Sequence, residues 1–400
     1  MASKIYFATD YAPSTDAFRL LEIPPDLERL FVAAASSSID EQEPLVFRGP
    51  MTTTTLASDS APSSAPRESG ATLHTSSATY SVREVNTSNT LLVCGKVAAD
   101  EWRVAHTTGN YMEPAPVPPP RLAESLHSLL AGTEAEDDAA FSPAASHSAT
   151  TPTWKRVTRA YLLDNVQASP DELDRELARM NAVSVDGYIR LLTLSYVRDV
   201  LTLLVATAMA LEMDLDALSC NAMAQQLVDD GVPAIVTSQL LYRYSTASRP
   251  DHGDTVVTLA IADQIPAVYG ECILARLGVC GSMLLSDFER EWQASVPEPL
   301  LCDLKHLESM TVIHASSPVA PRFIYYMPLG ELPGTVPERL KVLFGLRDTW
   351  PRPDLLRLVR DLTLDGSDKA GDSLLVKHAR LIKTGGTVVF GPRPDMGTRR

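Results

Sequence analysis

The feature that most constrains the fold of this chain is a change in the spacing of its apolar residues. Up to residue 120, apolar residues come in short runs bounded by turn-forming residues, at 18–23, 45–49, 79–85 and 90–94. Such runs are typical of short β-strands, and the two runs that flank the Asn/Thr/Ser cluster at 86–89 predict a hairpin. From residue 154 onward the apolar spacing is helical. The chain is therefore expected to be an α+β protein with a small β-barrel over residues 1–120.

Composition divides the chain further. The proline-rich segment 114–120 ends the expected barrel, and the acidic, Ser/Ala-rich stretch 121–153, which begins with a short helical pattern, is expected to be a linker. Residues 50–66 consist almost entirely of Ser, Thr, Ala and Pro. Because such a sequence buries too little apolar surface to offset the entropy of ordering, it predicts a disordered insertion at about 50–78.

Short helices followed by strands recur after residue 154. The clearest helix start is a capping box, with Ser169 at the N-cap, Pro170 at the first helical position and Glu172 at the third. A strand pattern follows at 188–192, and the same order recurs before the strand patterns at 255–261, 311–314 with 323–327, and 387–390. Helices followed by a hairpin are the layout of winged-helix domains.

This pattern predicts tandem winged-helix domains after the barrel. We expect winged helix 1 at 154–215, a second winged helix or helical connector at 216–270, and a C-terminal winged-helix region at 271–400. A generic α+β arrangement without a repeat is the alternative. Trp292 and Trp350 are expected in the core, where each indole N–H would find an acceptor.

The sequence disfavours several classes of protein. Its formal net charge of −15 excludes a generally basic nucleic-acid coat protein. The chain contains no G-x-x-x-x-G-K-[ST], G-x-S-x-G or H-E-x-x-H motif. Its five cysteines include no C-x-x-C pair, and its eight histidines show no zinc-ligand spacing. We therefore expect reduced thiols, no enzymatic activity, no cofactor and no metal.

No membrane contact is expected. The longest uncharged apolar run, Val200–Leu211, has twelve residues, whereas a membrane-spanning helix needs about 20. The N-terminal sequence also lacks the apolar stretch of a secretion signal. A buried helix in a soluble intracellular protein is the expectation.

Blocks of residues along nearly the whole chain resemble a known family. They are Phe18–Glu22, Leu45–Gly49, Thr79–Leu92, Tyr161–Ser169, Gly187–Leu192, Phe288–Glu298 and Leu343–Trp350. The stretches that contain Trp292 and Trp350 are the most specific, because tryptophan is rare. The chain resembles the Dcc family, named for defective sister chromatid cohesion, an accessory subunit of an alternative replication factor C clamp loader.

The resemblance implies a non-catalytic role in DNA replication and cohesion. Its N-terminal β-domain would fold together with two partners, the clamp loader's large subunit and the small Ctf-eight subunit. The winged helices would bridge the loader to the catalytic subunit of DNA polymerase epsilon and to DNA, in support of loading or unloading of the sliding clamp PCNA in the nucleus. The first winged helix is the region expected to contact the polymerase. A stand-alone winged-helix DNA-binding regulator is the alternative.

The expected hairpin is also the predicted partner-binding site. Exposed strand edges carry unpaired backbone donors and acceptors to which a partner can add a strand. The candidate residues are Val82, Arg83, Val85, Leu91 and Val93. The alternative is that this hairpin lies inside a closed barrel.

A basic C-terminal region is the predicted DNA-binding site. Residues 336–400 carry thirteen Lys/Arg and eight Asp/Glu, a difference of +5 in a chain of net charge −15. The helical pattern at 372–382 stands where a recognition helix is expected, and it would place two of the candidate residues on one face. The candidates for phosphate contacts are Lys377, His378, Arg380 and Lys383. A solvated helix face is the alternative.

Overall fold

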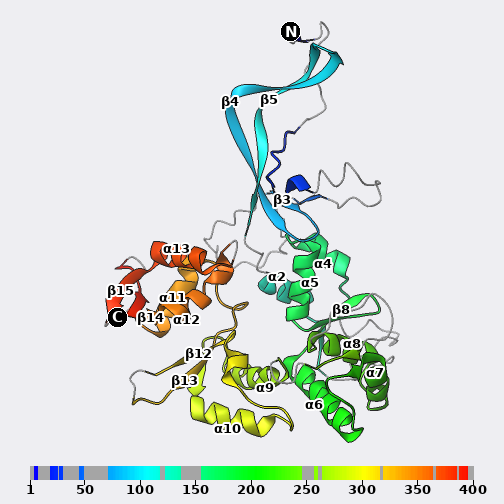
Figure 1. Cartoon of the computed structure of the whole chain (residues 1–400), viewed down its shortest axis with the longest axis vertical. Coiled ribbons are helices and arrows are strands. Elements are labelled where there is room, and N and C mark those ends of the chain that lie inside the picture. Colours follow the sequence, from blue (N-terminus) through cyan, green and yellow to red (C-terminus); the bar gives the residue numbers. More distant parts are fainter. Residues whose placement is uncertain are drawn as a thin grey trace, which may run out of the picture. The chain divides into compact units, whose positions relative to one another are not determined.

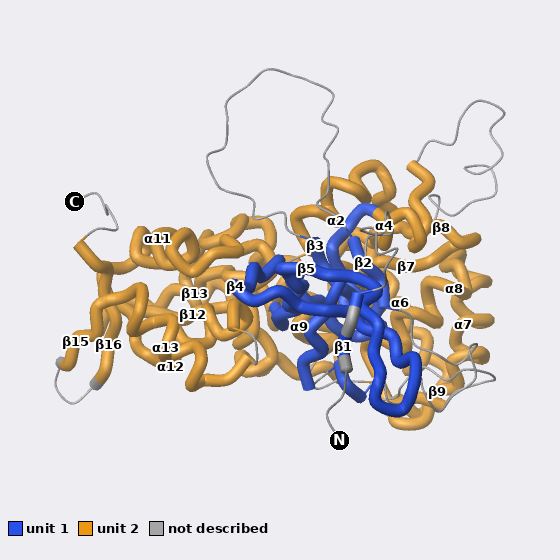
Figure 2. The backbone as a smooth tube through the Cα atoms, turned by 90° about the horizontal axis from the view of Figure 1, so that it is seen from above, with its two compact units in different colours: residues 1–120, 165–172 blue, residues 121–164, 173–400 orange. Residues whose placement is uncertain are grey.

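The computed structural model forms two compact units (Figure 1 and Figure 2). The first unit comprises residues 1–120 and 165–172, and the second comprises 121–164 and 173–400. Within them the structure describes residues 4–7, 19–25, 27–29, 45–48, 71–117, 122–136, 155–245, 256–259, 264–315, 319–363, 366–384 and 387–394. None of the helices in these ranges is long and apolar enough to cross a membrane.

The first unit is built on a five-stranded sheet. Its strands are β1 (Lys4–Phe7), β2 (Val46–Arg48), β3 (Ala71–His74), β4 (Thr79–Ala98) and β5 (Glu101–Pro116). They lie in the order β1-β5-β4-β3-β2, and only the β1–β5 pair is parallel. Among the described strands β1 and β2 are free edges, so the sheet is open and the expected closed barrel is not confirmed.

Strand β3 lies inside the region where a disordered insertion was expected, at about 50–78. The expectation is wrong for residues 71–78, because Leu73 is fully buried in a small apolar cluster with Leu27 and Tyr80. Residues 50–66, on whose composition the expectation was based, lie outside the described residues.

Strand β4 is continuous through the Asn/Thr/Ser cluster at 86–89, where a hairpin turn was expected. The chain instead turns at 99–100. Asn86 pairs with Asn110 and Leu91 pairs with Thr108, so residues 87–90 lie opposite Gly109 alone as a bulge. The Asn89 N–H donates to Thr87 Oγ1 (3.2 Å), which satisfies a backbone donor inside the bulge. Local side-chain to backbone bonding of this kind also occurs in turns, which is why the sequence pattern was ambiguous.

The described residues from Ala123 onward form four segments, here called modules 1 to 4. Modules 1, 3 and 4 have the order helix, strand, helix, helix, strand, strand, and the described part of module 2 has one strand fewer. Module 1 consists of α2 (Ala123–Leu130), β6 (Glu134–Ala135), α4 (Arg159–Asn165), α5 (Pro170–Arg179), β7 (Ala182–Val185) and β8 (Tyr188–Leu192). Its sheet order is β6-β8-β7, with β6 parallel to β8. The residues 165–172 within it belong to the first unit.

Helix α2 and strand β6 lie in the segment expected to be a linker. Strand β6 has only two residues and shows no periodicity. The buried Arg190 of β8 holds this segment, because its Nε donates to Thr133 O (2.9 Å) and its Nη2 to Glu134 O (3.1 Å). A long-range contact thus orders a segment that has no local strand signal.

Modules 2 to 4 follow in sequence. Module 2 consists of α6 (Leu194–Ala210), β9 (Leu218–Ser219), α7 (Cys220–Asp229), α8 (Ala234–Arg243) and β10 (Val256–Val257). Module 3 consists of α9 (Gln264–Ala275), β11 (Ser282–Leu284), α10 (Leu285–Ser295), the 3-10 helix η3 (Leu304–Leu307), β12 (Thr311–His314) and β13 (Phe323–Tyr326). Module 4 consists of α11 (Val336–Leu346), β14 (Trp350–Pro351), α12 (Arg352–Arg357), η4 (Arg360–Leu362), α13 (Asp368–His378), β15 (Arg380–Thr384) and β16 (Thr387–Gly391).

The sheets of modules 3 and 4 repeat the strand order of module 1. They run β11-β13-β12 and β14-β16-β15, and all their pairs are antiparallel. In module 2 the described part of the sheet is the β10–β9 pair with one bridge between Ser245 and Leu259. The expected recurrence of helices before a strand pair is therefore present in the structure.

Local signals explain where several helices begin. The capping box is confirmed: the Ser169 N–H donates to Glu172 Oε2 (2.8 Å) and the Glu172 N–H donates to Ser169 Oγ (3.2 Å). Side-chain oxygens of Thr193, Ser219, Thr335 and Ser367 accept hydrogen bonds at the starts of α6, α7, α11 and α13.

Modules 1 to 3 share one apolar core, while module 4 has a separate core that also takes in Val312 of module 3 and Met327, which follows β13. The expectation that Trp292 and Trp350 are buried is confirmed, although Trp350 lies on a strand. Each is 1% exposed, and their indole N–H groups donate to Pro266 O and Leu343 O (both 2.9 Å).

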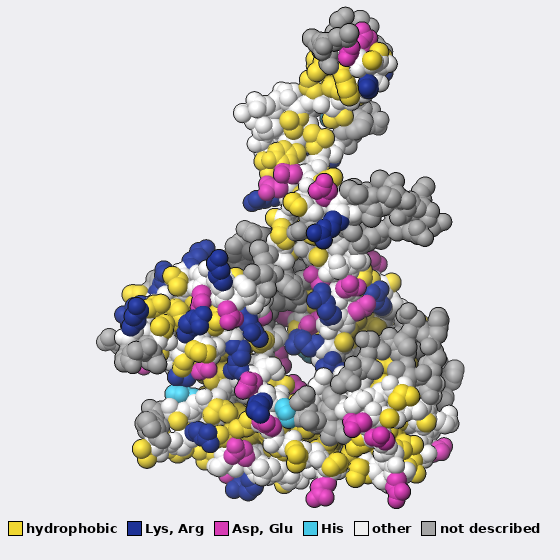
Figure 3. Space-filling view, viewed as in Figure 1, with side chains coloured by type: hydrophobic (Ala, Val, Ile, Leu, Met, Phe, Trp, Pro, Cys, Tyr) yellow, Lys and Arg dark blue, Asp and Glu magenta, His cyan; other side chains and the backbone are white. Residues whose placement is uncertain are grey.

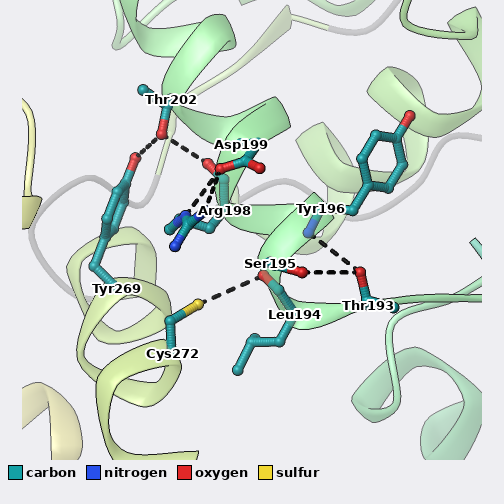
Figure 4. A network of polar contacts seen from close by, with 9 residues as sticks. All are labelled: Thr193, Leu194, Ser195, Tyr196, Arg198, Asp199, Thr202, Tyr269 and Cys272. Carbon is teal, nitrogen blue, oxygen red and sulfur yellow. Dashed lines mark hydrogen bonds and ion pairs between the residues drawn. The ribbon is translucent and has the colours of Figure 1, made fainter. Parts of the chain in front are cut away.

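Figure 4 shows how the first helices of modules 2 and 3 meet. The Thr202 and Tyr269 hydroxyls are 2.7 Å apart, and the Thr202 hydroxyl lies 2.8 Å from Arg198 O, to which it donates. The Cys272 Sγ donates to Leu194 O (3.6 Å), and burial raises the pKa of this thiol to about 11. These bonds join α6 to α9 beside the shared core.

Replacing a buried and an exposed leucine of module 3 by alanine should show that the loss of stability comes from core packing and not from the loss of a leucine as such. Leu274 is fully buried on α9, so we expect Leu274→Ala to destabilise the second unit by about 2–5 kcal/mol. Leu301 is 77% exposed, and Leu301→Ala should stay within about 0.5 kcal/mol of wild type. Urea denaturation followed by tryptophan fluorescence measures both. Equal losses of stability would contradict the shared core.

Candidate interaction surfaces

One edge of strand β4 is open beyond Val82. Strand β3 covers this edge only from Thr79 to Val82, and no described strand pairs with it from Arg83 onward. The direction of the backbone groups follows from β5. The Met112 N–H donates to Leu20 O (2.7 Å), and Met112 O accepts from Glu22 N–H (2.8 Å), so both groups point away from β4.

Glu84 is the partner of Met112 on β4. In an antiparallel pair, two residues that do not bond to each other both point their backbone groups outward. The N–H and C=O of Glu84 therefore face the open edge, whereas those of its neighbour Arg83 face β5. An open edge of this kind is a template for an added strand.

All five residues predicted to bind a partner lie on β4. Val82 packs beside the small core of the first unit, and Arg83 is exposed and forms an ion pair with Glu113 (3.0 Å). Val85, Leu91 and Val93 are partly buried. No partner chain is present, so their role in binding stays a prediction.

Sequence reasoning missed most of the apolar surface of the first unit. The exposed apolar side chains are Leu92 and Val97 on β4, Ile5 and Phe7 on β1, and Val46 and Phe47 on β2, with exposed fractions of 39–59%. Hydrophobic side chains are visible along the ribbon of β4 and β5 in Figure 3. The missed signal is the length of β4, because its 20 residues extend well beyond the small apolar cluster at Tyr80 and Val82, and no other apolar cluster of the described residues covers the rest of the strand.

The segment 165–172 is fastened to the sheet of the first unit. The Arg48 guanidinium donates from Nη1 to Ala168 O (2.7 Å) and to Val166 O (3.2 Å), and the Asp171 N–H donates to Ser76 O (3.0 Å). These bonds satisfy backbone groups of a short segment that contributes no strand to the sheet.

A buried chain of polar side chains completes this attachment. Thr79 Oγ1 donates to Glu172 Oε2 (2.6 Å), so its lone pairs accept from His74 Nδ1 (3.0 Å). His74 Nε2 is then the acceptor for the Thr72 hydroxyl (2.8 Å). Burial, and next the charge of Arg48, lower the pKa of His74 to about 4, against the opposing effect of Glu172. This series of hydrogen bonds therefore requires that the imidazole of His74 is neutral.

Exposed basic side chains gather on α13 and β15 of module 4. Lys377 lies on α13, but Arg380 and Lys383 lie on β15, because the helix ends at His378. The expected helix at 372–382 was thus misplaced, and Lys377 and Arg380 do not share a helical face. His378 is partly buried, and burial, then Lys377 and Arg393, lower its pKa, so at neutral pH it adds no positive charge.

Two further basic residues on this surface were missed. Lys369 is exposed in the first turn of α13, and Arg393 donates from Nη2 to Val376 O (2.8 Å) beside the C-terminal turn. Arg393 lies after the last strand, so only the fold brings it to the helix. We call Lys369, Lys377, Arg380, Lys383 and Arg393 together the basic face of module 4, although Arg380 and Lys383, three residues apart on β15, point to opposite sides of its sheet. Figure 3 shows Lys and Arg side chains over module 4.

The corresponding helices of the other modules differ from α13. Helix α5 carries four acidic and two basic residues, and its first three residues belong to the first unit. Helix α8 packs against β7 of module 1, and its only charged residue is Arg243. The basic face is therefore a property of module 4 and not of the repeat.

No group of three or more His, Cys, Asp or Glu side chains in the described ranges is arranged to hold a metal ion. The surfaces on which the geometry is informative are thus an open strand edge and a basic face, both suited to binding macromolecules.

Comparison with known proteins decides the family. The profile of the family described as sister chromatid cohesion protein Dcc1 matches residues 18–359. The chain belongs to the Dcc1 family. The matched region takes in β2 to β5 and modules 1 to 3, and it ends in module 4 before α13. The basic face at 369–393 lies outside the matched residues.

Individual relatives support the same assignment. The chain is 26% identical to sister chromatid cohesion protein DCC1 of Mus musculus over 328 residues, which span 79% of this chain and 78% of the mouse protein. It is 26% identical to the Homo sapiens protein of that name over 238 residues, 60% of this chain and 58% of the relative. For the Saccharomyces cerevisiae protein the values are 24% identity over 241 residues, 58% and 61%.

The buried His74 should make the first unit sensitive to acid. Its pKa of about 4 in the folded chain lies below the ordinary 6.5, so the unfolded chain binds more protons between these values. The free energy of unfolding that depends on neutral His74 is therefore fully present above about pH 6.5 and is lost as the pH falls towards 4. Amide exchange of β3, corrected for intrinsic rates, should show this loss of protection.

Removal of the titrating group should flatten that pH dependence. In His74→Gln, the protection of β3 should change less between pH 7 and pH 4.5 than in wild type. His127→Gln, at an exposed residue of α2, is the control and should leave the slope unchanged. A wild-type slope in His74→Gln would show that another group is responsible.

Proposed function

We propose that this chain is a non-catalytic accessory subunit that acts in sister chromatid cohesion and DNA replication in the nucleus. The observation that carries the proposal is the open, partly apolar edge of β4 in a member of the Dcc1 family. The partners we propose, on the resemblance of the sequence, are the large subunit of an alternative replication factor C clamp loader and its small Ctf-eight subunit. The chain would support loading or unloading of PCNA.

The open edge supports co-folding with such partners. A backbone donor and acceptor pair at Glu84 faces outward, and apolar side chains such as Leu92 and Val97 are exposed farther along the same strand. An added strand would satisfy the backbone groups and cover apolar area at the same time. Partner strands on this edge could also close the sheet into the expected barrel, because the described part of the sheet is open.

We further propose that modules 1 to 4 are winged helices. In modules 1, 3 and 4 the strand that comes last in the sequence lies in the centre of the sheet. It pairs on one side with the first strand and on the other side with the second strand. This order supports a helix-turn-helix followed by a wing, in which the third helix and the wing are the usual contact surfaces. Through these modules, with module 1 as the polymerase contact, the chain would connect the loader to the catalytic subunit of DNA polymerase epsilon.

The basic face of module 4 supports contact with DNA phosphates. Lysine and arginine on a helix and the adjoining strand position a protein on the duplex without reading its sequence. The net charge of −15 argues against a stand-alone regulator that binds DNA tightly by itself. Low-affinity, sequence-independent binding by the assembled subunit is the function we propose for this face.

The first test uses proline on the open edge. Glu84→Pro removes an N–H that faces outward and should be tolerated by the β4–β5 ribbon, since proline is compatible with strand edges. We expect it to abolish co-purification with the large subunit and the Ctf-eight subunit. The matched control Glu84→Ala keeps the N–H, loses the bond from Asn110 Nδ2, and should assemble normally.

Arg83→Pro would act differently, because the Arg83 N–H faces β5 and its loss would break the ribbon itself. Circular dichroism of both proline variants separates these effects. Normal assembly of a folded Glu84→Pro variant would overturn the proposed edge.

The second test removes charge from the basic face. We expect the Lys377→Gln, Arg380→Gln, Lys383→Gln triple variant to bind a short duplex more weakly, with a salt slope smaller by roughly 0.9 for each phosphate that is no longer neutralised. Fluorescence anisotropy at several salt concentrations measures both values. A triple variant of exposed arginines in modules 1 and 3, Arg175, Arg290 and Arg322 to Gln, controls for net charge. Equal slopes in the two variants would refute the site.

A further inference from the structure

Arg179 lies against the main chain of Gly330, and these two residues belong to different modules. Arg179 is the last residue of α5 in module 1, whereas Gly330 lies in the connector 327–335 between modules 3 and 4. A Cβ on Gly330 would be 2.5 Å from Arg179 Nη1 and 2.6 Å from Cζ. Real Cβ atoms essentially never approach other atoms to under 3.0 Å, so a Cβ at position 330 would push the flexible end of the Arg179 side chain out of this contact.

Carboxylates from three segments surround the Arg179 guanidinium. Glu176 of the same helix accepts from Nε (3.0 Å) and from Nη2 (2.6 Å). Glu271 of α9 and Glu331 of the connector add their charges, and together with the bonds to Glu176 they raise the pKa of Arg179. Glu271 is held in turn by the Tyr326 hydroxyl, which donates to its Oε1 (3.2 Å). The guanidinium is thus attracted to module 3 and to the connector.

The far end of the connector is built into module 4. Leu332 is 2% exposed in the apolar core of that module, and Pro333 O accepts from Arg339 Nε (2.8 Å) on α11. Residues 330–334 and α2 enclose a cavity of about 390 Å³, so close packing against α2 does not hold this stretch. Whatever holds Gly330 therefore also restrains the path into module 4.

We propose that Arg179 is a latch that fastens the connector at Gly330, in addition to the packing of Val312 in the core of module 4 and the hydrogen bond from Arg357 Nη2 to Thr311 O (2.6 Å), which already join modules 3 and 4. The Nη1 and Nη2 end of the guanidinium lies at Gly330, and the charges of Glu271 and Glu331 favour this position. The contact needs both the glycine and the arginine. It does not depend on DNA or on a partner chain, so it stands or falls separately from the proposed function.

Gly330→Ala, Arg179→Met and the double variant test the latch in the full chain. Each single variant removes the same contact, the first by displacing the guanidinium and the second by deleting it. Amide exchange of the connector should become faster by roughly two- to fivefold in each, as expected for a half-exposed ion pair. The double variant should exchange no faster than either single variant, because the effects of residues in one contact are not additive.

Two control variants match these changes. Gly345→Ala places a Cβ where no atom lies within 4 Å, and Arg175→Met removes a positive charge from the same helix α5. Neither should alter exchange of the connector. Exchange of α9, in the shared core, should be unchanged in every variant and reports whether the chain is folded.

Salt provides an independent measurement. Raising the ionic strength from about 0.1 M to 1 M shortens the screening length from about 10 Å to 3 Å, so wild-type connector exchange should approach that of Arg179→Met. Unchanged exchange in Gly330→Ala, or additive effects in the double variant, would overturn the latch.

Discussion

The burial of α9 on all its sides is the interaction on which the second unit depends. Its buried residues, Ile265 to Gly270 with Ile273 and Leu274, go round the whole helix. A Cβ on Gly270 would lie 2.9 Å from Leu307 Cδ1 and 3.2 Å from Trp292 Cε2, so neighbouring side chains reach the helix backbone. Because α6, α10, η3 and β13 all contact α9, modules 2 and 3 share one core, which extends to Val183 and Leu192 of module 1. A sheet of three short strands gains stability chiefly from such neighbours.

The two proposed binding surfaces, the β4 edge and the basic face, lie outside this core. The first unit has a small apolar cluster and a long ribbon, so its β4 edge is left for strands of other chains. Module 4 has its own core, and Lys369 and Lys377 of its helix α13 are exposed. The third helices of modules 1 and 2 take part in contacts within the chain. One module of a repeated fold can thus carry a basic face although the whole chain has a negative net charge.

Particular elements show how far the sequence could predict the fold. The capping box at Ser169 and the strand 188–192 were found, because neighbouring residues specify them. Helix α13 was placed four residues late, although Ser367 is a good N-cap. The bulge at 87–90 was taken for a turn, because both use the same polar residues. Strand β6 was invisible, because Arg190, more than 50 residues away, holds it. Of the candidate sites, the residues on β4 were found as a group, while Lys369 and Arg393 were not.

The sequence by itself determined the α+β class, the helices that precede a strand pair in modules 1, 3 and 4, the burial of the tryptophans and the family, because local spacing and rare residues carry this information. Only the tertiary structure decided which backbone groups of β4 face outward, which basic side chains meet on module 4, and that Arg179 lies on Gly330. These features depend on strand register and on contacts between residues far apart in the chain. No local pattern encodes them, since each partner alone has an ordinary sequence context.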